Sequence, residues 1–416
     1  MSLAALSVAA LVVAIVVSCA TSMNVGVLGI ALAWILGVYV GHLPVATVMN
    51  GFPSQLLLTL GGVTLLFTVA QLNGTLDRLA HHAVRSCRGN RGMLPIMFFV
   101  LPAALASMGP GNIATTAIIA PMAMSTAGRV GIPLFLMAIM VGNGANAGSL
   151  SPFAPTGIIV SGIMNRIGLP GHEWQTYLYN MLAHAIVGFG GYFLFGGWRL
   201  FASDGIAQAD AGAPSEGNIE RTHWITLAVI AGLILGVIVF DVNIGMGAFA
   251  GTVLLVLLGC ANDQTAIGKM PWNVIMMVCG VTVLIALLEK TAGIDWIVSQ
   301  VTRVATKGSV TPELAFVTGV VSVYSSTSGV VLPAFLPMVP RLTAEFGLNP
   351  FALASAINVS GHLVDVSPLS TIGALCLASA PVGKAAGLFN KLLAWGVSMT
   401  VVGALLCYLF FGRSAG

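Results

Sequence analysis

Residues 358–373 read N-V-S-G-H-L-V-D-V-S-P-L-S-T-I-G, between the apolar flanks FALASAI (351–357) and ALCLASA (374–380). Both flanks are apolar enough for lipid. The middle nevertheless carries glycine, proline, hydroxyl and amide residues, together with His362 and Asp365. Irregular backbone and charge at membrane depth are costly unless they line a cavity or bind something. The stretch therefore predicts a helix that breaks inside the membrane at a functional site.

Composition indicates that lipid is the main solvent of this chain. Of its 416 residues, 57% are hydrophobic and only 7% are charged, whereas soluble domains have about 25% charged residues. Apolar runs of about 20 residues favour helices over a β-barrel. The six cysteines show no paired spacing and are interpreted as buried apolar residues. We expect an all-α polytopic membrane protein, with the N-terminal apolar run retained as a helix because it lacks a basic start.

The two halves of the chain resemble each other at a nearly fixed offset. Three matches lie 216 residues apart: Pro121-Met122 with Pro337-Met338, Ser151-Pro152 with Ser367-Pro368, and Gly157 with Gly373. The longest hydrophilic segment lies between the halves. These observations predict repeat one over residues 1–201, a cytoplasmic linker over 202–222 and repeat two over 223–416.

Each repeat shows the same order of predicted elements. Repeat one has helices near 3–20, 24–41 and 52–74, an arm at 75–92, a hairpin at 94–128, a broken helix at 132–165 and a closing helix at 175–199. Repeat two has helices near 224–240, 243–260 and 271–289, an arm at 290–310, a hairpin at 312–340, a broken helix at 350–380 and a last helix at 385–411. Hairpin arms of about 14 residues are too short to span a core of about 30 Å, so we expect re-entrant hairpins. Five spanning helices per repeat would invert the second repeat, as in transporters.

Lys and Arg positions indicate the orientation. With the N-terminus outside, ten of the 16 Lys and Arg residues lie on or near the cytoplasmic side, including Arg78, Arg85, Arg88 and Arg91 of the first arm. Both termini are then predicted to be periplasmic.

Four helix breaks in matching positions predict a binding site rich in oxygen atoms. Free N–H groups at broken helices suit anions, and free carbonyl groups suit small cations. Gly, Ser and Thr also promote helix packing, so a single one is more often structural; the paired clusters are harder to explain in that way. The substrate-binding candidates are Asn112, Thr115, Ser151, Thr156, Ser326, Thr327, Ser328, Ser367, Ser370 and Thr371. The cation-binding candidates are Ser107, Gly111, Asn112, Asn143, Asn146, Ser325, Asn358, Ser360 and Asp365, with sodium as the only metal expected.

Three interpretations of Asp365 remain open on the sequence. It ligates a cation, it carries a proton together with His362, or the two form a structural hydrogen bond at the break. A carboxylate near an anionic substrate repels that substrate unless a cation or proton neutralises the carboxylate. This requirement would itself couple binding of the substrate to binding of the ion.

The hairpin tips resemble those of a known family. G-N-I (111–113) followed by A-T-T-A and A-P-M, and S-S-T (325–327) followed by V-V-L-P, are similar to the Ser-Asn-Thr motifs of the ion-transporter superfamily, which includes the divalent anion/sodium symporters. Within it the chain most resembles the MatC-type malonate/dicarboxylate carriers, over residues 20–410. It departs from their pattern, because only Asn112 remains of the first motif and Ser326 replaces the second asparagine.

This resemblance implies sodium-driven dicarboxylate uptake by an elevator mechanism, in a homodimer of the bacterial inner membrane. The residues themselves leave sodium and proton coupling open. The main alternative is a cation/proton antiporter that uses Asp365; a membrane enzyme or a channel is a further one. The sequence has no HExxH motif, nucleotide loop or metal cluster. We therefore expect no enzyme activity, no cofactor beyond the coupling ion and no nucleic-acid partner.

Overall fold

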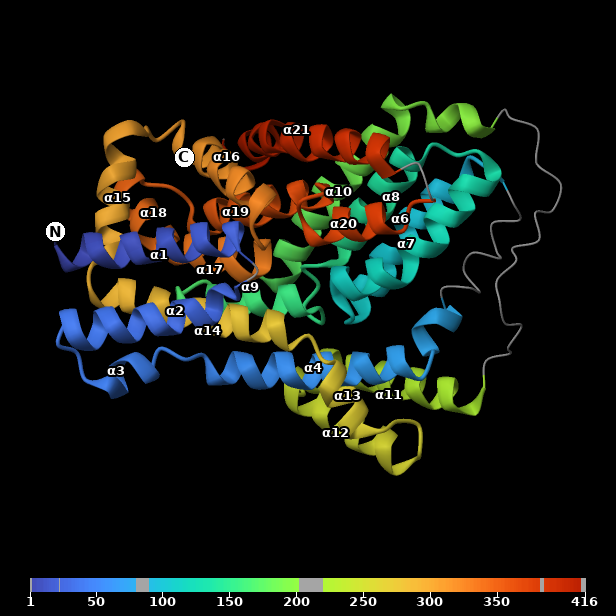
Figure 1. Cartoon of the computed structure of the whole chain (residues 1–416), viewed down its shortest axis with the longest axis horizontal. Helices are drawn as coiled ribbons and strands as arrows, with labels where there is room; N and C mark the ends of the chain where they lie inside the picture. Colours follow the sequence, from blue (N-terminus) through green and yellow to red (C-terminus); the bar gives the residue numbers. More distant parts are fainter. Residues whose placement is uncertain (1, 22, 80–89, 202–219, 382–384, 413–416) are drawn as a thin grey trace.

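The structure is a computed structural model that describes residues 2–21, 23–79, 90–201, 220–381 and 385–412. Within these ranges all regular secondary structure is helical, as the sequence predicts. Most helices run along the long axis of the molecule (Figure 1). The positions Arg85, Arg88 and Lys384, most of the predicted linker and most of the first arm lie outside the described residues.

The elements follow the same order in both halves of the chain. The first half has α1 (Leu3–Ala20), α2 (Val25–Trp34), η1 (Ile35–Val40), α3 (Val45–Met49), α4 (Ser54–Leu72), α6 (Met93–Met108), α7 (Gly111–Val130), α8 (Leu134–Gly148), α9 (Pro155–Arg166), α10 (Glu173–Leu194) and η2 (Gly197–Phe201). The second half has α11 (Arg221–Phe240), α12 (Ile244–Leu257), α13 (Asp263–Lys269), α14 (Trp272–Lys290), α15 (Gly293–Val304), α16 (Val310–Tyr324), η3 (Thr327–Val331), α17 (Leu332–Phe335), η4 (Leu336–Met338), α18 (Val339–Phe346), α19 (Pro350–Leu363), η5 (Val364–Val366), α20 (Thr371–Ala378) and α21 (Ala385–Phe411).

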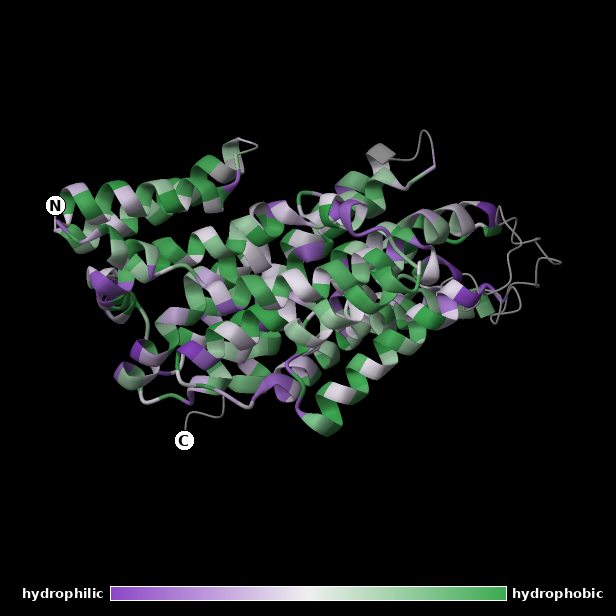
Figure 2. Cartoon of the chain, turned by 90° about the horizontal axis from the view of Figure 1, so that it is seen from below, coloured by the Kyte–Doolittle hydropathy of each residue, from purple (hydrophilic) through white to green (hydrophobic). Residues whose placement is uncertain are grey.

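Hydrophobic residues cover much of the length of the helices (Figure 2). Five segments of the described chain are long and apolar enough to cross a membrane: Val45–Leu72, Arg221–Phe240, Trp272–Lys290, Pro350–Ala378 and Gly387–Phe411. Six shorter apolar helices of 10–17 residues accompany them. The described residues thus support a multi-pass protein, but by length and composition they do not reach the expected five spans per repeat. The shortfall is greatest in the first half, which supplies one of the five segments.

The halves are interleaved through two helix crossings that depend on glycine. α2 packs against α14, and α12 packs against α4. A β-carbon on Gly280 of α14 would lie 2.2 Å from the Gly26 carbonyl oxygen of α2. In the other crossing, a β-carbon on Gly62 of α4 would lie 2.2 Å from the Gly245 carbonyl oxygen of α12. Small residues let the backbones approach closely in both places. The second helix of each half, α2 or α12, therefore packs against a helix of the other half.

α6 with α7, and α16 with the segments up to α18, each fold back as a hairpin with its two ends close together; that these hairpins are re-entrant stays a prediction. Arg91, just before α6, donates from Nη2 to the Gly131 carbonyl oxygen at the end of α7, at 3.0 Å. In the second half, Lys307 Nζ lies 3.9 Å from the place of a β-carbon on Gly347, just after α18. Gly131 and Gly347 both have positive φ, 70° and 62°. The two pairs are again 216 residues apart.

The hairpins differ from the prediction in length and regularity. α6 has 16 residues and α7 has 20, so the second arm is about 30 Å long at 1.5 Å per residue. In the second hairpin the returning arm is divided into η3, α17, η4 and α18, where Pro333, Pro337 and Pro340 interrupt the regular hydrogen bonding. The first hairpin opens toward the right end of Figure 1 and the second toward the left end. This is the arrangement that inverted repeats require; the inversion itself stays a prediction.

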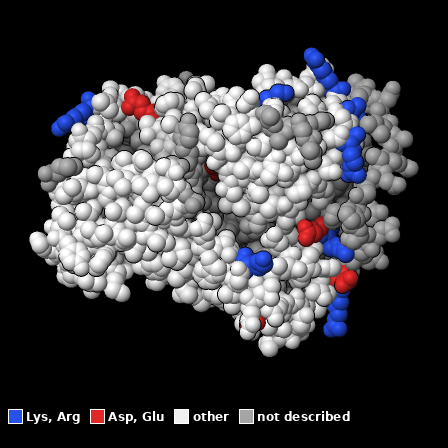
Figure 3. Space-filling view, in the orientation of Figure 1, with Lys and Arg blue, Asp and Glu red and all other residues white. Residues whose placement is uncertain are grey.

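Charged side chains and the chain ends are distributed unevenly along the long axis of the molecule. On the face shown in Figure 3, Lys and Arg gather mostly toward the end where α6 and α7 open. α1 begins and α21 finishes toward the opposite end (Figure 1). Which end faces the cytoplasm remains the prediction made from Lys and Arg positions.

Candidate functional site

The first hairpin tip lies directly on the break between α8 and α9. Gly109, with φ 141°, and Gly111, with φ 76°, form the turn between α6 and α7. In the first turn of α7, Asn112 Nδ2 donates to Asn146 Oδ1 of α8 at 2.8 Å. Ser151 Oγ, in the break, donates to the Ser107 carbonyl oxygen at 2.7 Å. Two hydrogen bonds therefore join the tip to the broken helix.

The starts of α7 and α9 adjoin at this tip. A β-carbon on Gly111 would lie 3.0 Å from Pro155 Cδ, and these residues begin α7 and α9. The N–H groups at a helix N-terminus carry a partial positive charge. Two such ends, with the hydroxyl groups of Thr115 and Thr156 buried nearby along these helices, form a neutral environment suited to an anion.

The second hairpin tip contacts its break through hydroxyl groups and one carboxylate. Thr327 Oγ1 donates to Asp365 Oδ1 at 2.6 Å. Ser322 Oγ donates to the Gly361 carbonyl oxygen at 2.9 Å and also contacts Thr327 Oγ1. Asp365 lies in η5 and is only 8% exposed. This cluster places a carboxylate and a carbonyl oxygen near the end of α19, which are ligand types that a hard cation prefers.

The two breaks have the same backbone geometry. A β-carbon on Gly157 would lie 1.9 Å from the Ser151 carbonyl oxygen, and one on Gly373 would lie 2.0 Å from the Ser367 carbonyl oxygen. Ser151 Oγ accepts a hydrogen bond from Phe153 N, and Ser367 Oγ accepts one from Leu369 N, both at 3.3 Å. The Ser-Pro pairs found at the 216-residue offset thus form equivalent turns.

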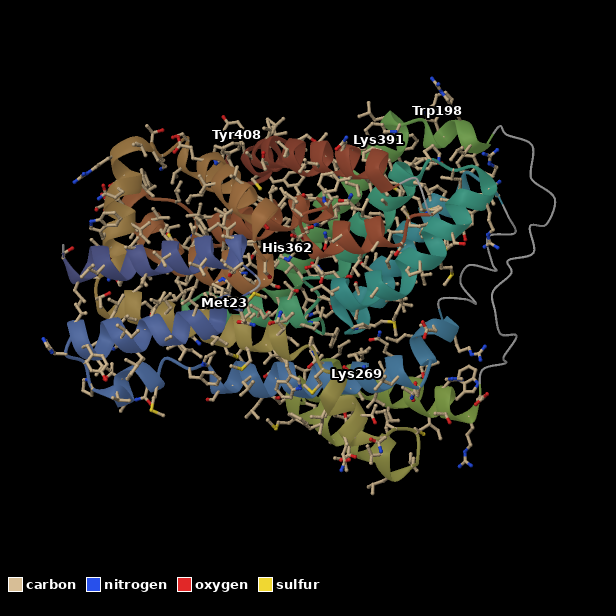
Figure 4. All side chains as sticks on the ribbon, viewed as in Figure 1. Met23, Trp198, Lys269, His362, Lys391 and Tyr408 are labelled. Atoms are coloured by element: carbon tan, nitrogen blue, oxygen red, sulfur yellow. The ribbon has the colours of Figure 1, made fainter. Side chains whose placement is uncertain are left out.

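One side chain links the two clusters. Asn146 accepts from Asn112 through Oδ1 and donates through Nδ2 to the His362 carbonyl oxygen of α19 at 3.4 Å. Its own carbonyl oxygen accepts from Asn180 Nδ2 of α10 at 2.7 Å. His362 lies in the middle of the molecule (Figure 4). Asn146 therefore connects the first hairpin tip to α19, at the residue next to Gly361 of the second cluster.

The structure brings some predicted residues to the two clusters and leaves others elsewhere. Asn112, Asn146, Ser107, Ser151, Thr327 and Asp365 take part in the tip-to-break contacts described above. Ser370 bonds the Asp365 carbonyl oxygen, and the side chain of Ser367 is fully buried. Ser326 instead accepts from Gly329 N and caps η3, and Ser325 bonds the Val321 carbonyl oxygen. Ser360 contacts Thr318 of α16, Asn143 contacts His184 of α10, Ser328 is half-buried and Thr371 is exposed.

His362 and Asp365 turn to different partners. His362 Nδ1 bonds the Asn358 carbonyl oxygen at 2.8 Å, within α19, whereas the Asp365 carboxylate bonds Thr327. No hydrogen bond between the two side chains occurs in the described part of the chain. Their separation disfavours the structural-pair interpretation and leaves cation binding and proton carriage open.

Sequence reasoning missed several polar residues on unbroken helices. His184 and Asn180 of α10, Ser355 of α19 and Ser322 of α16 are all fully or almost fully buried. They stand within continuous helices, outside the breaks that glycine and proline mark. The spacing of Asn180 and His184, four residues apart on one helix face, is the signal that could have found two of them.

Comparisons with known proteins point to the same class of protein. The first 149 residues match the family model described as "Dicarboxylate carrier protein MatC N-terminus". The chain is 23% identical over 351 residues to "Uncharacterized transporter Rv2685" of Mycobacterium tuberculosis, and 23% identical over 353 residues to "Uncharacterized transporter Mb2703" of Mycobacterium bovis; each match covers 79% of both proteins. The fold is similar to that of the YdaH transporter of Alcanivorax borkumensis, with a TM-score of 0.53, 16% identity and coverage of 89% of both chains.

Together with the fold, these matches define the chain as a multi-pass membrane transporter. More narrowly, residues 1–149 are similar to the N-terminal part of the MatC dicarboxylate carrier protein. The resemblance predicted from the hairpin tips is confirmed for that part. The similarity to transporters agrees with the expectation of a transporter rather than an enzyme.

Proposed function

We propose that this protein is a secondary active transporter that imports small dicarboxylates by cation-coupled symport. The observation that carries the proposal is the asymmetry of the two tip-to-break clusters. The first is neutral and adjoins two helix N-termini, at Gly111 and Pro155. The second contains the one carboxylate, Asp365, held by Thr327.

From this asymmetry we infer different roles for the two half-sites. Helix N-termini and amide or hydroxyl donors stabilise a carboxylate without an arginine. We place the substrate dianion at Asn112 and Thr156, and the coupling cation between Asp365, Thr327 and the Gly361 carbonyl oxygen. Asn146 connects the two through hydrogen bonds to Asn112 and to the His362 carbonyl oxygen. Binding of the cation would remove the repulsion between Asp365 and the substrate, so neither crosses alone.

Malonate or a C4-dicarboxylate is the proposed substrate class, because the N-terminal match is to a dicarboxylate carrier. Sodium is the proposed coupling ion and a proton is the alternative. We further propose an elevator movement in a homodimer of the bacterial inner membrane, with both termini periplasmic. Two separate hydrophobic cores, each built from both halves, would suit two bodies that move relative to each other.

The test is uptake of radiolabelled malonate and succinate into proteoliposomes that contain the purified protein. An inward Na⁺ gradient is imposed at constant pH, or a pH gradient at constant Na⁺. Asp365→Asn is compared with Asp295→Asn, which changes an acid that is 46% exposed and pairs with Arg341 at 3.2 Å. We expect Na⁺-driven uptake in wild type and in Asp295→Asn, and none in Asp365→Asn.

Uptake that follows only the pH gradient, and is lost in Asp365→Asn, would make the proton the coupling ion. If neither gradient drives uptake of either acid, the substrate assignment is wrong. In that case, proton release on Na⁺ addition would identify the second candidate, a cation/proton antiporter. The burial of a single carboxylate at the Thr327 tip is the observation that favours this candidate.

A further inference from the structure

A second polar region lies between α10 and α19, away from the hairpin tips. These helices pack against each other. Phe351, Ser355, Asn358 and His362 form one stripe along α19, at helical spacings of four, three and four residues. Phe351 stacks on His172 at 4.3 Å and contacts Tyr179 at 5.9 Å, between ring centroids. Because these two residues lie at the start of α10, the stripe faces α10.

The opposite wall comes from a face of α10 that also meets α8, since Asn180 bonds the Asn146 carbonyl oxygen and His184 contacts Asn143. Thr176, Asn180 and His184 are each four residues apart and are fully or almost fully buried. Thr176 Oγ1 and Asn358 Nδ2 both contact Met164 Sδ, at 3.8 and 4.0 Å, which places Asn358 beside α10. We call this region the α10–α19 seam.

Five side-chain atoms in the seam are buried without a hydrogen-bond partner: Asn180 Oδ1, His184 Nε2, Ser355 Oγ, Asn358 Oδ1 and His362 Nε2. Their residues are at most 1% exposed. Most buried polar side-chain atoms in proteins have a partner, so each exception needs an explanation. Five of them on two facing helices indicate that something else occupies the seam.

The five atoms are all able to accept. His362 Nδ1 must donate, because its partner is the Asn358 carbonyl oxygen; its Nε2 therefore keeps a lone pair in the neutral ring. His184 Nδ1 faces Asn143 Oδ1 at 3.0 Å, and the Asn143 amide nitrogen already donates to the Ile139 carbonyl oxygen. His184 Nε2 is thus also an acceptor. The two amide oxygens are acceptors by nature, and the Ser355 hydroxyl oxygen has lone pairs.

We propose that the α10–α19 seam is a binding site for one small monovalent cation. Acceptors without matching donors attract positive charge, and a single cation satisfies several at once. The site carries no formal charge. α8, which supplies Asn143 beside His184, has no ionisable residue in its sequence, and the Asp365 carboxylate turns to Thr327. A neutral set of ligands favours a single over a double charge, because burying the larger charge is more costly. The seam is distinct from the cation position proposed at Asp365 and does not depend on transport of any substrate.

The test is thermal unfolding of the purified protein in detergent, without substrate, in Na⁺, K⁺, NH₄⁺ or choline chloride at equal ionic strength. It is done in Asp365→Asn, so that the other cation position is removed. A ligand that binds only the folded state raises the unfolding temperature. We expect a saturable rise with at least one of the three small cations relative to choline. A rise with Na⁺ or K⁺ would identify a metal-ion site, and a rise with NH₄⁺ alone would identify a site for a protonated cation that donates hydrogen bonds.

Two further changes locate the effect. Ser355→Ala removes one acceptor and should raise the half-saturating concentration about tenfold. Asn358→Asp keeps the shape and adds a negative charge, so it should lower that concentration by about tenfold. Ser398→Ala is the control, because Ser398 is exposed and bonds the Trp395 carbonyl oxygen within α21, outside the seam. Absence of a saturable rise in Asp365→Asn, or a rise that neither seam change alters, overturns the proposal.

Discussion

The side-chain oxygen of Asn146 accepts a 2.8 Å hydrogen bond from the Asn112 amide, which joins the tip of the first hairpin to the end of α8. The same side chain donates to the His362 carbonyl oxygen of α19. Asn146 is therefore the place where the half-site built by residues 107–156 meets the half-site built by residues 322–370.

Asn146→Leu should weaken both folding and transport. The change leaves the Asn112 amide and the His362 carbonyl oxygen buried without this partner, and each such loss is worth about 1–3 kcal/mol of stability. We expect chemical unfolding in detergent at lower denaturant concentration, and a clear fall in dicarboxylate uptake. Asn165→Leu, at an exposed position of α9, is the control. Wild-type stability and uptake in Asn146→Leu would show that the bridge between half-sites has no role.

Thr327→Val should affect cation use more than folding. Valine matches the shape of threonine but cannot donate to Asp365, whose carboxylate then loses its 2.6 Å hydrogen bond. We expect the Na⁺ concentration for half-maximal uptake to change by about tenfold, since a hydrogen bond to a charged group is worth roughly 1.5–3 kcal/mol. Thr327→Ser retains the hydroxyl group and should behave like wild type. An equal effect of both changes would attribute the loss to packing instead.

Much of the fold could be predicted because local signals mark it. Glycine, serine and proline stand at both breaks, and the predicted limits 132–165 and 350–380 contain α8 with α9 and α19 with α20 almost entirely. α7 has 20 residues and is longer than the expected hairpin arm of about 14 residues. Pro110 and Gly111 end the turn early, and Pro121 lies inside α7 without ending it. A proline in a membrane helix is tolerated where neighbouring groups compensate.

The candidate site was predicted only in part, because contacts between distant helices leave no local mark. Asn112 and Asp365 stand beside glycine and proline, and their sequence context revealed them. Ser326 stands where the family pattern has an asparagine, and its side chain caps η3. His184 and Asn180 lie on a continuous helix, and their hydrogen-bond partners Asn143 and Asn146 lie on α8. A single sequence does not say which helix packs against α10.

Gly280→Ala should destabilise the protein although it adds only one methyl group. The new β-carbon would meet the Gly26 backbone at 2.2–2.5 Å, so α2 and α14 must separate. Overpacking of this kind costs about 1–3 kcal/mol. Gly232→Ala on α11 is the control, because nothing lies within 4 Å of the added atom. There, the better helix propensity of alanine should leave stability unchanged or slightly raised. Chemical unfolding of both proteins in detergent measures the difference, and similar curves would show that the crossing is loose.

Gly157→Ala and Gly373→Ala should have equal effects in the two halves. Each new β-carbon would fall 1.9–2.0 Å from the carbonyl oxygen of Ser151 or Ser367, closer than any real contact allows, so either Ser-Pro turn must open. We expect both proteins to lose at least about 1–3 kcal/mol of stability and to lose uptake. Gly190→Ala in α10 and Gly387→Ala in α21 are matched controls with nothing within 4 Å. A strong effect in one half and none in the other would mean that the two breaks, despite their common geometry, do not carry the same constraint.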